Sequence, residues 1–201
     1  MTSVSDRLKD ITFFPYWLDS PDAPSVEPEL IGNTEADLLI VGGGFTGLWA
    51  AIQAREQNPQ LDVVLIEAGK VAYGASGRPG AIVSTSVMHG LANAARIFPN
   101  DLHALERMGQ ENMEGFKAAL DRYDIDAEDE WGGELTVAVG KGRVGDLDEE
   151  FKLHKEHGHD AVLLDRYQVR AEIDSPVYEA GVWSKHLSGT VHPAKLATKM
   201  F

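Results

Sequence analysis

Residues 37–47 read Asp-Leu-Leu-Ile-Val-Gly-Gly-Gly-Phe-Thr-Gly, an apolar run that ends in a glycine-rich turn. Residues 38–41 are continuously apolar, as expected of a strand buried on both faces of a parallel sheet. The pattern then predicts a helix over residues 46–56 and a second apolar strand over residues 63–66, which ends at Glu67. Strand, tight turn, helix and strand in this order form a βαβ unit, so the sequence predicts an α/β fold.

The glycines follow the spacing Gly42-x-Gly44-x-x-Gly47, and each has a mechanical role in a dinucleotide site. Gly42 permits the tight turn, Gly44 lets the backbone approach a pyrophosphate, and Gly47 lets the helix pack close to the strand. The helix N-terminus offers N–H groups and a positive dipole end to phosphates. Glu67 stands where a carboxylate accepts hydrogen bonds from ribose hydroxyls, and its charge disfavours the 2′-phosphate of NADP. The sequence therefore predicts a dinucleotide-binding site.

The composition is that of an acidic globular protein. The chain has 201 residues, 43% hydrophobic and 25% charged, with a formal net charge of -14. This length is sufficient for one good-sized domain or slightly more. The negative charge repels phosphate backbones and anionic lipids, so we expect neither a nucleic-acid nor a membrane partner. The absence of cysteine excludes disulfides, thiolate metal sites and cysteine nucleophiles within this chain.

Nothing in the sequence predicts export or membrane insertion. Residues 1–6 lack the basic region and apolar run of a secretory signal. No stretch reaches the roughly 18 apolar residues that a membrane span requires. We therefore expect a cytoplasmic location.

The glycine fingerprint by itself does not distinguish FAD from NAD. Residues 74–81, Gly-Ala-Ser-Gly-Arg-Pro-Gly-Ala, form a small-residue loop shortly after Glu67. Such a loop can bring backbone N–H groups, a hydroxyl and a guanidinium against a second part of a large cofactor. This feature disfavours the alternative of an NAD-binding dehydrogenase domain.

Residues 37–47, Glu67-Ala68-Gly69 and the Gly-Ala-Ser-Gly-Arg run at 74–78 together resemble the D-amino-acid oxidase-type family of FAD-dependent oxidoreductases. That family includes glycine oxidase, sarcosine oxidase and gamma-glutamylputrescine oxidoreductase. The strong similarity covers residues 36–81, and a looser one extends to the end of the chain. The resemblance implies a Rossmann-like FAD-binding domain with a parallel sheet, interleaved with the start of an α+β substrate domain.

The resemblance also implies a set of cofactor-binding residues. The pyrophosphate turn would comprise Gly42, Gly44, Phe45, Thr46 and Gly47, with Glu67 on the adenosine ribose. The diphosphate, ribityl and isoalloxazine parts would lie along Ala75, Ser76, Arg78, Gly80 and Ala81.

Two residues of the loop depart from the usual family pattern, which has Asn-Gly-Gly after the arginine. Pro79 removes one N–H donor, and Ala81 adds a methyl group near the expected flavin position. Arg78 occupies the position of the histidine that attaches flavin covalently in some relatives, and cysteine is absent, so noncovalent FAD is expected. An alternative for Arg78 is a surface salt bridge.

The resemblance implies amine or amino-acid oxidation, in which a hydride leaves the carbon next to an amine nitrogen and the imine product is hydrolysed. The protein would supply orientation and a dry pocket. Family members are usually nearly twice as long, so we expect the N-terminal half of such an enzyme, binding FAD poorly by itself. The alternative is a non-catalytic truncated remnant or one subunit of a split flavoenzyme, completed by a complementary chain. No catalytic residue is assigned.

Four segments organise the chain. We expect an N-terminal arm at 1–32, an FAD-binding domain at 33–125, part of a substrate domain at 126–188, and a truncated return helix at 189–201. Within the arm, Phe13, Phe14, Tyr16 and Trp17 form an aromatic group expected to pack against the body of the protein, with an exposed recognition patch as the alternative. The patterns further predict these elements: helices at 101–122, 143–156 and 167–173, strands at 134–139 and from 181, and a helix from Pro193.

The histidines give weaker signals. His154, His157 and His159 cluster on a Lys/Glu-rich segment without an evident carboxylate partner, so a solvated helix end is favoured over a metal site. No metal is therefore expected. His89 follows the glycine loop and is interpreted as a packed histidine rather than a group near the flavin.

Overall fold

The computed structural model describes residues 8–86 and 88–201, so the prediction of no export signal at residues 1–6 lies outside them. The chain forms two compact units. The first unit comprises Met1–Gly80, Ile125–Ala127 and His192–Phe201, of which residues 1–7 are not described. The second comprises Ala81–Asp124 and Glu128–Val191. None of the helices in the described part combines the length and apolar character needed to cross a bilayer.

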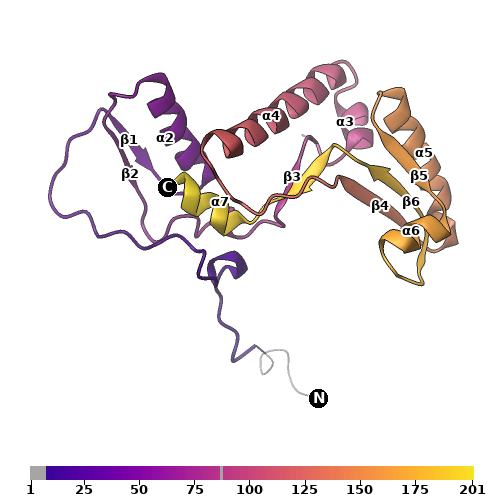
Figure 1. Ribbon diagram of the computed structural model, residues 1–201, viewed down its shortest axis with the longest axis horizontal. Coiled ribbons are helices and arrows are strands. Elements are labelled where there is room, and N and C mark those ends of the chain that lie inside the picture. Colours follow the sequence, from indigo (N-terminus) through magenta and orange to yellow (C-terminus); the bar gives the residue numbers. More distant parts are fainter. Residues whose placement is uncertain (1–7, 87) are drawn as a thin grey trace. The chain divides into compact units, whose positions relative to one another are not determined.

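The first unit contains the predicted βαβ element (Figure 1). Its strands pair in parallel, with Leu38 opposite Val63 and Val41 opposite Ile66. The α/β prediction and the predicted strands are thereby confirmed, because a parallel pair needs a crossover connection of the kind that the helix provides. The elements of this unit are η1 (Tyr16–Leu18), β1 (Leu38–Val41), α2 (Phe45–Gln57), β2 (Val63–Ile66), η2 (Ala75–Gly77) and α7 (Pro193–Met200).

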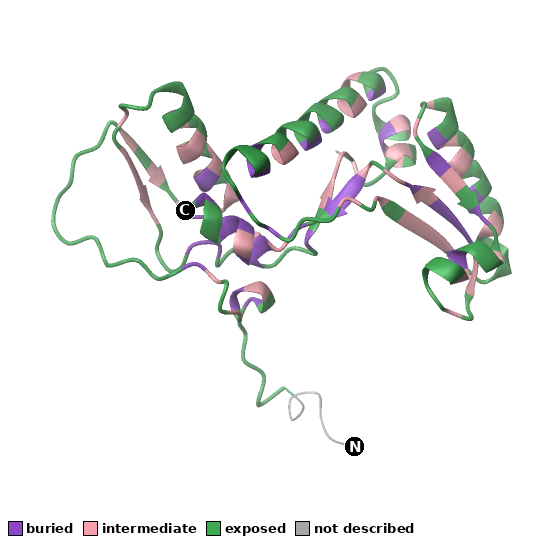
Figure 2. Cartoon of the chain, in the orientation of Figure 1, coloured by how far each residue is buried: buried purple, intermediate pink, exposed green. Residues whose placement is uncertain are grey.

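Strand β1 is covered on one face only, which contradicts the prediction of burial on both faces. Leu38 and Ile40 are half-buried, whereas Leu39 and Val41 are 57% and 77% exposed. Figure 2 shows this alternation along the strand. Side chains alternate between the two faces of a strand, and α2 packs against the face that carries Ile40. The continuous apolar run therefore correctly predicts a strand, but the second face of that strand is exposed in this chain.

The aromatic group of the N-terminal arm packs only in part. Trp17 donates through Nε1 to the carbonyl of Pro79 at 2.9 Å, and its ring lies 5.1 Å from that of His192. Phe14 packs edge-on against a tyrosine ring of the same unit. Phe13 and Tyr16 are 82% and 80% exposed, so the prediction that all four aromatic residues pack is wrong for these two.

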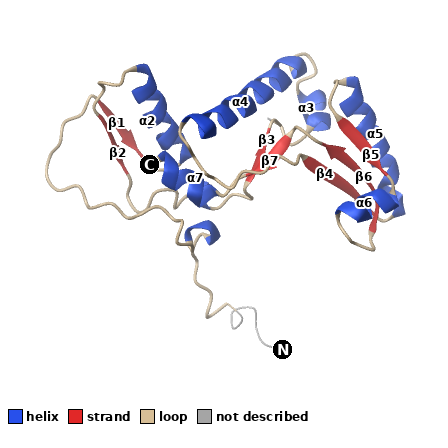
Figure 3. Ribbon diagram, in the orientation of Figure 1, coloured by secondary structure: helices blue, strands red, loops and turns tan. Residues whose placement is uncertain are grey.

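The second unit has two antiparallel sheets, four α-helices and one 3-10 helix among its described residues (Figure 3). One sheet has the order β4-β6-β5, and the other pairs β3 with β7. The elements are β3 (Ile82–Ser84), α3 (Leu91–Ile97), α4 (Leu102–Arg122), β4 (Glu134–Val139), η3 (Lys141–Arg143), α5 (Val144–Glu156), β5 (Ala161–Leu164), α6 (Arg166–Glu172), β6 (Tyr178–Ser184) and β7 (Ser188–Thr190).

The core of the second unit lies between α5 and the three-stranded sheet. Val182 on β6 is fully buried, and Val144 and Phe151 on α5 pack against the same cluster. The predicted helices at 101–122, 143–156 and 167–173 and the strand at 134–139 are confirmed within a residue. Strands β3, β5 and β7 and helix α3 were not predicted, because segments this short are too brief to show a clear period.

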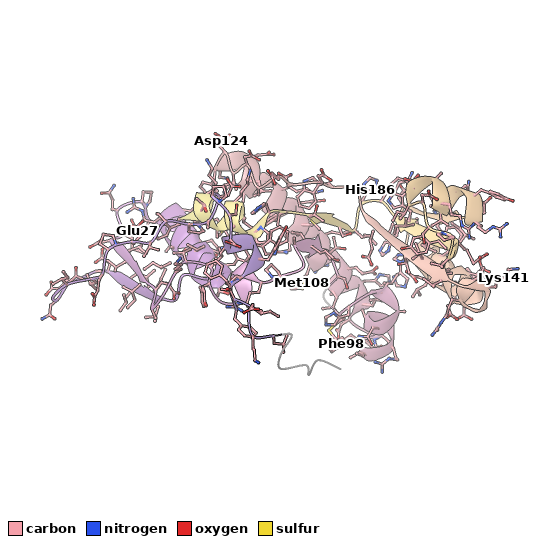
Figure 4. All side chains as sticks on the ribbon, turned by 90° about the horizontal axis from the view of Figure 1, so that it is seen from below. Glu27, Phe98, Met108, Asp124, Lys141 and His186 are labelled. Atoms are coloured by element: carbon pink, nitrogen blue, oxygen red, sulfur yellow. The ribbon has the colours of Figure 1, made fainter. Side chains whose placement is uncertain are left out.

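Helix α4 is amphipathic, as its spacing predicts, with Met113 and Leu120 buried. Met108 on the same helix is 57% exposed and is labelled in Figure 4. Gly109 lies in the buried stripe, where an added Cβ would overlap the carbonyl oxygen of Thr85. The helix thus approaches the end of β3 more closely than any side chain allows.

The division into compact units lies at different positions from the predicted domain boundaries. Residues 81–124 cluster with the second unit, although the sequence suggests that 33–125 form one domain. Residues 192–201, expected as a return helix, cluster with the first unit. The assignment of these ranges to cofactor and substrate domains stays a prediction.

Candidate functional site

The glycine-rich turn joins β1 to α2 in the first unit. Gly42 has a φ of 107°, in the region that favours glycine. At Gly47, an added Cβ would overlap the carbonyl oxygen of Gly42 and lie 3.3 Å from the Ile40 side chain. The first turn of the helix therefore rests directly on the end of the strand. This is the close helix–strand contact that the glycine spacing predicts.

The N-terminus of α2 carries free backbone donors. The carbonyl of Gly44 accepts the first helical hydrogen bond, from Leu48 N at 3.0 Å. Within residues 8–86 and 88–201, the N–H groups of Gly44, Thr46 and Gly47 have no acceptor. Orphan N–H groups and the positive end of the helix dipole together favour an anion.

Glu67 closes the site at the end of β2. Its Oε2 accepts a hydrogen bond from Gly43 N at 2.8 Å, and its Oε1 accepts one from Gly69 N at 2.9 Å. These bonds, led by that from Gly43, hold the pKa of Glu67 below its ordinary value. The side chain is exposed, and a carboxylate has about four lone-pair positions, so both oxygens retain room for ligand hydroxyls.

The loop 74–81 reaches the glycine-rich turn through Ser76. Phe45 N, at the start of α2, donates to Ser76 Oγ at 2.9 Å. An added Cβ on Gly44 would lie 3.1 Å from the same hydroxyl and within 4 Å of no other atom outside its neighbours. Two sequence segments that were predicted separately thus meet at one helix N-terminus, and Gly44 keeps the position next to Ser76 free of a side chain.

The other predicted residues of the loop are arranged differently. Arg78 donates through Nε to the carbonyl of Tyr73 at 3.1 Å, and its guanidinium carbon lies 5.1 Å from the Tyr73 ring centroid. Among the described residues it forms no ion pair, so the surface salt-bridge alternative is not observed. Ala75 and Gly80 are exposed.

Ala81 belongs to the second unit, where its carbonyl accepts a hydrogen bond from Val191 N at 3.0 Å. It is buried and has a φ of 64°. That backbone conformation favours the glycine found at this position in the family pattern, and it costs a residue with a Cβ of order 1 kcal/mol or more.

The histidines do not follow their predicted roles. His89 is exposed with a φ of 57°, so its interpretation as a packed histidine is wrong. His154, His157 and His159 are largely buried, with side chains 10%, 16% and 9% exposed, which excludes a solvated helix end. We call these three residues, together with His103 and Glu106, the histidine cluster.

The carboxylate that the sequence did not reveal is Glu106 on α4. Its Oε2 lies 2.9 Å from His157 Nδ1, and its Oε1 lies 2.9 Å from His159 Nε2. Glu106 and His157 are 51 residues apart in the chain. No local pattern in the sequence therefore indicates this pairing.

Burial governs the ionisation of His154. Desolvation lowers its pKa, and the neighbouring charge of His159 lowers it further, whereas Glu106 acts in the opposite direction. His154 is therefore neutral near pH 7. A cavity of ≈ 800 Å³ in the same unit is lined in part by Glu106, His154 and His159, together with residues of α3, α4 and α5.

Comparison with known proteins identifies the family. The family model described as FAD dependent oxidoreductase matches residues 37–201. Gamma-glutamylputrescine oxidoreductase of Escherichia coli is 32% identical over 163 residues, which cover 80% of this chain and 37% of that protein. The protein named "Probable oxidoreductase OrdL" of Haemophilus influenzae is 29% identical over 182 residues, covering 89% of this chain and 41% of that protein.

Solved structures agree on the fold. Glycine oxidase from Geobacillus kaustophilus superposes with a TM-score of 0.66 at 16% identity, covering 82% of this chain and 43% of that one. The chain spans about two fifths of the length of the curated relatives it matches. The family resemblance, the FAD cofactor and the Rossmann-like fold expected from the sequence are thereby confirmed. This chain belongs to the family of FAD-dependent oxidoreductases.

Proposed function

We propose that this chain supplies the FAD-binding part of an oxidoreductase that acts on small amines or amino acids. The single observation that supports this most strongly is the meeting of three groups in the first unit. The free N–H groups at the start of α2, the carboxylate of Glu67 and the hydroxyl of Ser76 all surround the glycine-rich turn. A dinucleotide needs donors for its phosphates and an acceptor for its ribose, and this arrangement offers both.

The residues fit the adenosine diphosphate part of FAD. The N–H groups of Gly44, Thr46 and Gly47 would donate to the diphosphate, with Gly42 and Phe45 completing the turn. Glu67 would accept from ribose hydroxyls through lone pairs that Gly43 and Gly69 leave free. Gly44 carries no side chain where a phosphate must approach, which is the space that a Cβ would fill.

The remaining cofactor contacts are proposed from family similarity. Ala75, Ser76, Arg78, Gly80 and Ala81 would lie along the rest of FAD. Noncovalent binding is supported by Arg78, which engages Tyr73, and by the absence of cysteine from the chain.

When bound, FAD supplies an acceptor for a hydride from the carbon next to an amine nitrogen. The residues of this chain bind and orient the cofactor, and none of the described ones is assigned to proton transfer or substrate binding. Amine substrates are supported by the names of similar proteins, among them the gamma-glutamylputrescine oxidoreductase and glycine oxidase.

We also propose that catalysis requires further polypeptide, in the same chain or in a complementary one. The support is that the chain spans about two fifths of its curated relatives. A cytoplasmic setting is proposed from the acidic composition, with a net charge of -14.

The test is a calorimetric titration of the purified 201-residue chain with FAD and, separately, with ADP. We expect weak, saturable FAD binding that ADP displaces, because the free N–H groups at the start of α2 would bind the diphosphate that both ligands share. Gly44→Ala should lower the affinities for FAD and for ADP roughly 10- to 100-fold, the change expected when one or two charge-assisted hydrogen bonds are lost. Gly145→Ala is the matched control, because an added Cβ there meets no atom within 4 Å and lies in the other unit.

Two outcomes would contradict the proposal. One is the absence of binding for both ADP and FAD by the wild-type chain, which would remove the dinucleotide site itself. The other is unchanged affinity in Gly44→Ala while its thermal unfolding also stays unchanged, since the added methyl group would then occupy space that no ligand uses.

A further inference from the structure

We propose that His103, Glu106 and His157 bind a divalent transition-metal ion of the Zn²⁺ type in the second unit. One ligand atom from each residue lies within 4.8 Å of the other two. His157 Nδ1 and His103 Nδ1 lie 2.9 Å and 3.8 Å from Glu106 Oε2. Ligands about 2.0–2.1 Å from a tetrahedral Zn²⁺ are about 3.3 Å apart, so the two distances to Glu106 Oε2 bracket the required spacing.

The three ligands come from two helices, and their side chains differ in conformational freedom. His103 and Glu106 stand three residues apart on α4, which places them on one face of the helix. His157 is the C-cap of α5 and its side chain is largely buried, so its position is held by the surrounding structure. The side chain of His103 is 94% exposed and can rotate toward an ion without disturbing the core. A bound ion would therefore connect α4 to the end of α5.

The second carboxylate oxygen of Glu106, Oε1, faces away from His103 and His157 toward a further layer of imidazoles. This oxygen is buried, and although His159 Nε2 lies 2.9 Å away, no donor among the described residues is directed at it in hydrogen-bond geometry. His159 Nδ1 lies 2.8 Å from His154 Nδ1, which places a second layer of imidazoles behind the carboxylate. Such outer contacts orient a metal-binding carboxylate and raise its affinity.

The chemistry of the ligands selects the class of ion. Two imidazole nitrogens and one carboxylate oxygen suit Zn²⁺ and its transition-metal neighbours, whereas Ca²⁺ and Mg²⁺ prefer oxygen ligands alone. Three protein ligands leave one coordination position for water. The net charge of -14 also favours the approach of a cation.

The competing explanation is a purely structural cluster, in which His157 and His159 serve only as partners of Glu106. In that explanation His103 is only an exposed i, i+3 partner of Glu106, 3.8 Å from the carboxylate, and its removal would not affect metal binding. His103 is therefore the residue that distinguishes the two explanations.

The experiment is a Zn²⁺ titration of the tag-free, chelator-treated full chain by calorimetry, with X-ray absorption at the zinc edge of the loaded protein. We expect one Zn²⁺ per chain with two imidazoles in its coordination shell. His103→Ala should weaken binding at least tenfold while thermal unfolding of the metal-free protein stays unchanged, because that side chain is exposed. Glu106→Gln and His157→Ala should weaken it further.

His186→Ala is the matched control. This histidine is 76% exposed, lies 3.4 Å from Asp160 in the same unit and is labelled in Figure 4. Its loss should leave Zn²⁺ affinity unchanged. Equal affinity in the wild type and His103→Ala, or a coordination shell without two imidazoles, would overturn the proposal. Gly44→Ala should retain the Zn²⁺ site, so failure of the FAD proposal and failure of this one are distinguishable.

Discussion

Gly47 and Gly109 meet the same steric requirement in the two compact units. At each, a Cβ would overlap a backbone carbonyl oxygen, that of Gly42 for Gly47 and that of Thr85 for Gly109. Gly47 belongs to a spacing that predicts its role. Gly109 stands on an amphipathic helix and belongs to no motif in the sequence.

The difference lies in the sequence distance to the partner. Gly42 and Gly47 are joined by one short turn, so their close approach leaves a fixed spacing in the sequence. Thr85 and Gly109 are brought together by the packing of α4 against β3, and the intervening helix α3 gives no constant spacing. A local close contact is therefore readable from sequence, whereas an equally tight long-range contact is not.

The largest expected effect comes from Gly47→Ala. The methyl group must displace the carbonyl of Gly42, the residue that follows β1, so we expect destabilisation by about 3 kcal/mol or more. Binding of ADP and FAD should be lost with it. Urea unfolding and calorimetry measure the two effects. Gly74→Ala, where a Cβ meets no atom within 4 Å, is the stability control. Comparable stability of the two variants would show that the turn is more adaptable than its geometry indicates.

Gly109→Ala should have a similar but smaller effect on the second unit, about 2 kcal/mol, because helix α4 can shift slightly away from Thr85. Gly115 on the same helix is the matched comparison, since a Cβ there meets no atom within 4 Å. Gly115→Ala should stabilise the protein by about 0.5–1 kcal/mol through helix propensity. Urea unfolding measures both stability changes. Destabilisation by Gly109→Ala together with stabilisation by Gly115→Ala would support the equivalence of Gly109 and Gly47. Changes of the same sign would contradict it.

Glu67→Gln should have the smallest effect, and that effect should depend on pH. Backbone hydrogen bonds lower the pKa of Glu67 from its ordinary value of 4.5. A lowered pKa in the folded state means that the stabilisation is present above the unfolded pKa and is lost as pH falls through the folded pKa.

The variant should therefore lose at most about 1 kcal/mol at neutral pH, because the side chain is exposed and screened. The difference from the wild type should narrow as the pH is lowered through and below 4.5. Unfolding free energies across this range test the sign. A difference that grows as pH falls would mean that Glu67 is not stabilised in its charged form.

Much of the first unit was predictable because its signals are local. The bounds of β1 and β2 and the position of Glu67 agree with the periodicity of residues 37–67. The burial of β1 was not predictable, because exposure of Leu39 and Val41 depends on what covers the second face of the strand. The sequence predicted that the glycine-rich turn and the loop 74–81 bind the same cofactor. It did not predict that Ser76 accepts a hydrogen bond at the N-terminus of α2.

By itself, the sequence determined the βαβ element, the glycine turn and the family, since each depends on residues close together in the chain. Only the tertiary structure decided that His157 and His159 contact Glu106 rather than water, with His154 packed against His159. It also decided that Gly109 tolerates no side chain. The physical reason is the same in both cases. Burial and close approach depend on partners tens of residues away in the chain, and no local period or spacing in the sequence indicates which residues those partners are.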